Sequence, residues 1–73
     1  MKEFLRLVYN VKNSIGTGYF ETVEANDITE AKIKKSYDDH IEKKKIIQYF
    51  DNEKEMKEYI NLIPVTEWKL KRK

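Results

Sequence analysis

KEFLRLVYNVK, residues 2–12, decides the fold, because apolar residues recur at alternate positions along the whole stretch. The alternation defines two faces: Leu5, Leu7, Tyr9 and Val11 on one, and Phe4, Arg6, Val8 and Asn10 on the other. A period of two residues is typical of an extended chain, whose side chains point alternately to opposite sides. The stretch therefore predicts a β-strand.

A second strand is expected directly after the first. Asn13 to Gly18 contains turn-forming residues, and an extended pattern resumes from Tyr19 to Ala25. Together the two strands predict a β-hairpin, with Gly16-Thr17-Gly18 in its turn. The two glycines do not indicate a phosphate-binding loop, because neither a helix nor a GK[ST] continuation follows them.

The first predicted helix starts at Asp27, which forms a capping box with Glu30. Its apolar stripe is thin, and we expect this stripe to face the core. The stripe comprises Ile33, Tyr37 and, if the helix extends far enough, Ile41. The sequence leaves the end of this helix open over residues 38–43.

The second predicted helix starts at Asn52, with Glu55 at the third helical position. Its apolar residues fall at spacings i, i+3, i+4 and i+7: Met56, Tyr59, Ile60 and Ile63. This spacing places them on one face of a helix, and Pro64 ends the element because proline disfavours helical geometry in the residue before it.

Two more strands complete the expected fold. Lys44 to Phe50 is apolar on both faces and predicts a central strand. Val65 to Arg72 alternates, with Trp68 among the inward residues and lysines outward, which is typical of a sheet edge. We therefore expect one α+β domain over residues 1–73, in the order ββαβαβ. Its four-stranded mixed or antiparallel sheet would carry both helices on one face.

Composition limits the classes of protein that the chain can represent. At 73 residues it is too short for two domains, and with no cysteine it has neither disulfides nor thiolate metal sites. Its uncharged runs are far below the ~20 apolar residues that span a bilayer, so we expect no membrane partner and a cytoplasmic location. Lysine outnumbers arginine by 13 to 2, and the many lysines predict an AT-rich bacterial or phage genome.

No arrangement in the sequence indicates an enzyme, a cofactor or a metal site. Asp38, Asp39 and His40 are consecutive, and neighbours on a helix point about 100° apart, so they do not converge on one ion. Ser36 lies four residues from His40, but such pairs are far commoner as incidental surface neighbours than as catalytic groups. We expect a non-enzymatic protein without cofactor or metal.

The most favoured function is a protein-binding module, such as a phage or mobile-element accessory protein that binds and inhibits a host or phage protein. If both helices cover the Leu5 face, the other sheet face is left exposed. The predicted contact residues are Phe4, Arg6, Val8, Phe20 and Trp68. A homodimer that buries this face or the edge of the last strand is compatible with that function.

The alternative function is nucleic-acid binding through a lysine-rich surface. The residues that would carry it are Lys43, Lys44, Lys45, Lys69, Lys71, Arg72 and Lys73. This alternative requires the two groups to converge in space. A net charge of only +2 makes a solvated charged surface the preferred interpretation.

Overall fold

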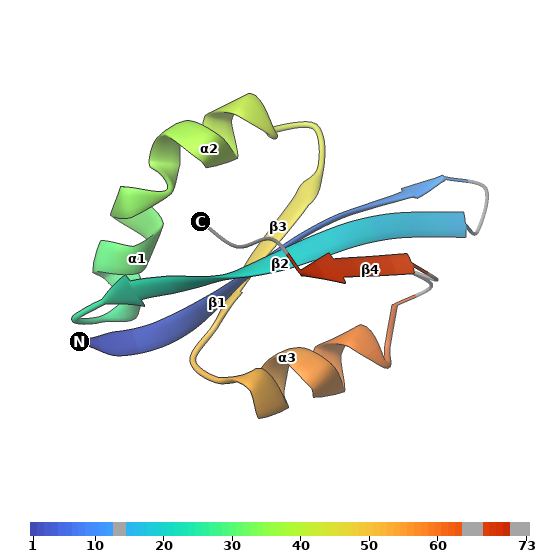
Figure 1. Ribbon diagram of the computed structural model, residues 1–73. Helices are drawn as coiled ribbons and strands as arrows, with labels where there is room; N and C mark the ends of the chain where they lie inside the picture. The colour runs from blue at the N-terminus through green and yellow to red at the C-terminus, as the bar shows by residue number, and fades with distance from the viewer. Residues whose placement is uncertain (13–14, 64–66, 71–73) are drawn as a thin grey trace.

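A computed structural model describes residues 1–12, 15–63 and 67–70, apart from the side chains of Lys12, Ile15 and residues 67–70. The chain is a small α+β domain, as its sequence predicts. Its centre is an antiparallel sheet in which β1 (Lys2–Lys12) lies between β2 (Ile15–Ala25) and β3 (Ile46–Phe50). The short strand β4 (Glu67–Leu70) runs parallel to β2, which gives the strand order β3-β1-β2-β4 (Figure 1).

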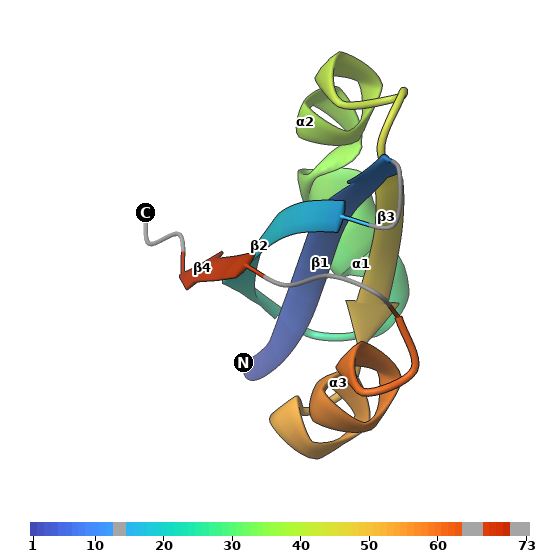
Figure 2. The same ribbon diagram turned by 90° about the vertical axis from the view of Figure 1, so that its right-hand side faces the viewer.

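Helices cover both faces of this sheet, in contrast to the expected arrangement on one face. The first helical segment consists of α1 (Ile28–Lys34) and α2 (Ser36–Ile41), and the second is α3 (Glu53–Ile60). Figures 1 and 2 show α1 and α2 on the other side of the strands from α3. The element order is therefore ββααβαβ in the described residues rather than ββαβαβ.

The physical reason for this arrangement lies in β1, which is apolar on both of its faces. Phe4 packs in one buried cluster with Val23 of β2 and Ala31 of α1. Leu7 belongs to a second cluster, with Met56 of α3. Because each face of β1 carries large apolar side chains, each face needs its own cover.

Several local predictions are confirmed, and others need correction. The first strand has the predicted bounds, whereas β2 begins at Ile15 instead of Tyr19. Gly16 and Gly18 are therefore strand residues opposite Val11 and Tyr9, not part of the turn, because pairing with β1 extends along its full length to Lys12. The predicted central strand is an outer strand, because its partner on one side is β1 and it ends the strand order.

Both predicted caps form. The Asp27 carboxylate accepts a hydrogen bond from the backbone nitrogen of Glu30 at 2.8 Å. The Asn52 side chain accepts one from the backbone nitrogen of Glu55 at 2.9 Å. Each bond satisfies a backbone donor that the first turn of a helix leaves unpaired. No helix in the described part of the chain has the length and apolar character needed to cross a bilayer.

The apolar face of α3 packs on the sheet as its periodicity predicts. Met56 is 1% exposed and lies in a cluster with Leu7 and Tyr9 of β1. Further members of this cluster from α3 and the residues after it are Tyr59, Ile60 and Ile63. Tyr59 also meets the ring of Tyr9 edge-on, at 6.0 Å between centroids, and joins it by a hydrogen bond between hydroxyls.

Met56 is the deepest side chain of α3, so its loss should weaken the attachment of this helix. We expect Met56→Ala to lower the free energy of unfolding by about 2–5 kcal/mol, because it leaves a cavity between α3 and β1. Denaturant unfolding followed by circular dichroism measures this change. The control Glu58→Ala changes an exposed residue of the same helix and should cost under about 0.5 kcal/mol. Equal stabilities for both variants would contradict the observed packing.

Candidate functional site

The surface expected from the sequence is not exposed. Phe4, Arg6 and Val8 are 5%, 0% and 0% exposed, because α1 and α2 cover the sheet face that they occupy. Phe20 belongs to the cluster under α3, on the opposite face. The side chain of Trp68 lies outside the described residues. The prediction of a shared contact surface for these residues is therefore wrong for Phe4, Arg6 and Val8, and Phe20 does not lie beside them.

A network of buried charges replaces that surface, with Arg6 of β1 at its centre. Its Nε donates a hydrogen bond to Asp39 of α2 at 2.7 Å. Its Nη1 donates to Glu21 of β2 at 2.8 Å and to the hydroxyl of Tyr19 at 3.2 Å. Register explains the strand partners, because Arg6 pairs with Glu21 across the hairpin. Arg6 thus connects the sheet to α2.

A second set of bonds surrounds these groups. Lys35, between α1 and α2, donates to Glu21 at 2.8 Å and is itself 5% exposed. The hydroxyl of Tyr49 in β3 donates to Asp39 at 2.7 Å. The hydroxyl of Tyr19 donates to Glu42, after α2, at 2.9 Å. We call Arg6, Tyr19, Glu21, Lys35, Asp39, Glu42 and Tyr49 the charge network.

The two cations of the charge network, Arg6 and Lys35, hold their protons more tightly than isolated side chains do. Burial by itself would lower the pKa of Arg6, but the hydrogen bonds that it donates to Tyr19 and Asp39 outweigh burial and raise this pKa above its ordinary value. The pKa of Lys35 is likewise raised, because its bond to Glu21 outweighs burial. Glu21 accepts hydrogen bonds from both cations, and Asp39 accepts a further one from Arg6. Arg6 Nη2 is buried without a hydrogen-bond partner among the described residues.

The side of α1 and α2 that faces the sheet carries apolar residues at its start and charged residues further along. Ala31 of α1 packs in the buried cluster with Phe4. Lys35 bonds to Glu21 of the sheet, and Asp39 of α2 bonds to Arg6. The apolar side chains expected in the core point outward instead: Ile33, Tyr37 and Ile41 are 67%, 73% and 63% exposed. We call these three residues the apolar stripe. The expectation that the apolar stripe faces the core is wrong, because the sheet beneath offers Arg6 and Glu21 as partners.

The helices that carry the apolar stripe, and the turn after them, also carry exposed lysines. The exposed lysines on α1 and on the turn after α2 are Lys32, Lys34, Lys43, Lys44 and Lys45. Asp38 is an exposed acid on the same helices, and it contacts the buried Lys35 at 3.5 Å. The exposed surface of this part of the chain therefore combines the apolar stripe with lysines, of which Lys34 and Lys45 pair with Glu30 and Glu42.

The two lysine groups proposed for nucleic-acid binding do not share an edge of the sheet. Lys43 to Lys45 directly precede β3, the outer strand on one side. Lys69 lies in β4, the outer strand on the other side. Lys71, Arg72 and Lys73 fall outside the described residues. A single phosphate-tracking surface thus lacks support from the described part of the chain.

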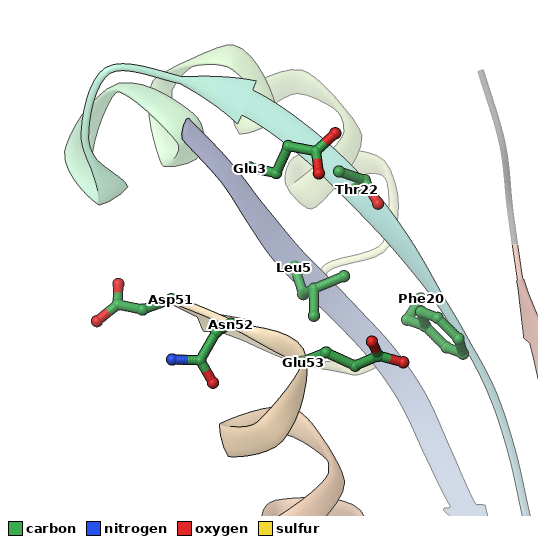
Figure 3. A pocket seen from close by; sticks show the side chains of 7 residues that line it. All are labelled: Glu3, Leu5, Phe20, Thr22, Asp51, Asn52 and Glu53. Carbon is green, nitrogen blue, oxygen red and sulfur yellow. The ribbon is translucent and has the colours of Figure 1, made fainter. Parts of the chain in front are cut away.

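A hollow of about 460 Å³ opens on the other sheet face, beside the start of α3 (Figure 3). Leu5 and Phe20 provide its apolar lining, and Glu3, Asp51 and Glu53 surround it with carboxylates. Such a hollow suits a cation on an apolar arm. Among the described residues, His, Asp and Glu side chains form no group of three or more that could hold a metal ion.

Sequence reasoning missed Glu21, Lys35 and Asp39 as partners of Arg6. A signal for them exists in the spacing of Ala31, Lys35 and Asp39, which is as regular as that of the apolar stripe. A helix with apolar and polar residues at equal spacing can face a sheet with either side, and a cation inside an apolar strand favours the polar side. Comparisons with family models, with curated proteins and with solved structures gave no match, so the function is inferred from geometry.

Removing one carboxylate of the charge network should be costly. Glu21→Gln leaves Arg6 and Lys35 buried without their shared anion, and we expect it to lower the free energy of unfolding by about 3–5 kcal/mol. Thermal and denaturant unfolding measure this effect. Glu24→Gln is the matched control, because Glu24 lies on the same strand but is exposed. A loss of under about 1 kcal/mol for Glu21→Gln would show that the network does not hold α1 and α2.

Proposed function

We propose that this chain is a non-enzymatic protein-binding module whose contact surface is the apolar stripe of α1 and α2. The observation that carries the proposal is the exposure of Ile33, Tyr37 and Ile41, each above 60%. Single exposed apolar residues are common on protein surfaces. Three at four-residue spacing along one helical segment are the pattern by which helices insert into a partner's groove.

The charge network supports this proposal because it fixes which side of the helices is exposed. With Lys35 bonded to Glu21 and Asp39 bonded to Arg6, α1 and α2 cannot rotate without breaking buried ion pairs. The apolar stripe is therefore presented to solvent in a defined orientation. A prearranged contact surface lowers the entropy that binding costs.

The partner is a protein with an apolar groove bordered by carboxylates. Tyr37 is the expected anchor, since tyrosine supplies a large contact area at low entropic cost. The exposed lysines of α1 and of the turn after α2 would attract the partner's acidic border and accelerate association. A module that covers such a groove acts most simply as an inhibitor of the protein that carries it. A phage or mobile-element source remains our prediction from composition.

Loss of the apolar stripe should abolish binding without unfolding the chain. We expect Ile33→Ser and Tyr37→Ser each to weaken binding to the partner by about tenfold or more, because interface anchors contribute ~1.4 kcal/mol or more. The partner is first captured from lysate of the source organism with nuclease present, then purified for affinity measurements by calorimetry. Leu62→Ser is the matched control, because Leu62 is 83% exposed outside the stripe.

Two results would contradict the proposal. In the first, Ile33→Ser and Tyr37→Ser bind the partner as tightly as the unmodified chain and the Leu62→Ser control do. The other is capture that disappears with nuclease, together with salt-sensitive DNA or RNA binding that Lys43→Gln, Lys44→Gln and Lys45→Gln remove. The second result would favour the nucleic-acid alternative.

A further inference from the structure

The outer edge of β3 is a second surface to which another chain could bind. β3 pairs with β1 through Leu5 to Tyr9 on one side. Among the described residues, no backbone hydrogen bond joins its other side to the rest of the chain. Figure 2 shows β3 at the outside of the sheet, opposite β4. The backbone groups on this edge are available to another strand.

The sequence of β3 lacks the features that usually protect an outer strand. Ile46–Phe50 reads IIQYF, with no charge, no proline and no glycine. Outer strands are normally blunted by lysine, proline or a bulge, because a flat apolar edge pairs with other chains. The β-branched and aromatic residues of IIQYF have high strand propensity. Ile46 is 45% exposed, so this strand has apolar surface left to bury, and the side chain of Gln48 is exposed as well.

We propose that a second copy of this chain pairs its β3 antiparallel to this edge, across a twofold axis at Gln48. Residues directly opposite each other in an antiparallel pair lie on the same face of the sheet. Side chains alternate between the two faces along a strand, so two residue numbers of β3 on the same face are both even or both odd. The residue numbers of each opposed pair in the dimer therefore add up to an even number. Only the register in which each pair adds up to 96 gives all five residues of Ile46–Phe50 an opposed partner, with Gln48 opposite its own copy.

This register is self-complementary on both faces. Ile46 lies opposite Phe50 of the partner subunit, and Ile47 lies opposite Tyr49 of the partner subunit. Each is a pair of a β-branched and an aromatic residue, a favourable combination across antiparallel strands. A foreign strand would have to reproduce this pattern, whereas a second copy supplies it by symmetry.

The charges that flank β3 add a further reason for a second copy. Lys45 directly precedes the strand and Asp51 directly follows it, and both are exposed. In the proposed register Lys45 approaches Asp51 of the partner subunit, and the same pair recurs at the other end. The dimer does not rest on the proposed function, because β3 lies outside the apolar stripe.

A lysine at the twofold axis should prevent this dimer. We expect the unmodified chain to sediment at twice its 8.8 kDa mass as concentration rises from about 10 µM to about 1 mM. Gln48→Lys opposes two like charges and should raise the dissociation constant at least about tenfold. Thr29→Lys adds the same charge on an exposed residue of α1 and should change it by less than about twofold. Circular dichroism verifies that each variant is folded.

A charge exchange tests the register itself. Lys45→Glu and Asp51→Lys should each weaken the dimer severalfold, since each opposes like charges, and the double variant should return to within about twofold of the original value. A monomer at every concentration would overturn the proposal. Dimers indifferent to Gln48→Lys would overturn the choice of β3, and a double variant no better than the single ones would overturn the register.

Discussion

One buried guanidinium, that of Arg6, is the constraint on which the arrangement of this domain depends. A cation buried inside the central strand of a sheet destabilises the fold unless anions pair with it. Glu21 supplies one anion from the neighbouring strand and Asp39 supplies the other from α2, at 2.8 and 2.7 Å. Because the second anion comes from a helix, the orientation of that helix follows from the position of Arg6.

The orientation of α2 determines which of its side chains are exposed at the surface. A helix that directs Lys35 and Asp39 inward must direct the residues between them outward, and these include Tyr37. The charge network and the proposed contact surface therefore lie on opposite sides of the same short helices. Both sheet faces carry an apolar cluster, and the charge network adds buried ion pairs on the face under α1 and α2.

Local features of the fold followed from the sequence, and non-local ones did not. The alternation over residues 2–12 and the caps at Asp27 and Asn52 depend on neighbouring residues alone, so they were predictable. The outer position of β3 was not, because strand order depends on contacts between distant segments. The apolar stripe was assigned to the core on the rule that helices bury their apolar side, and Arg6 reverses this rule here. The candidate site was missed for the same reason.

The central claim is that α1 and α2 face the sheet with the side that carries Ala31, Lys35 and Asp39, and turn the apolar stripe to solvent. The measurement that tests it most directly is broadening of methyl signals in nuclear magnetic resonance by a soluble paramagnetic probe, which reports the exposure of each side chain. The account predicts strong broadening for Ile33 and Ile41, weak broadening for Val23, and a slowly exchanging Nε proton on Arg6. Protected methyls on Ile33 and Ile41, together with rapid exchange at Arg6, would contradict it.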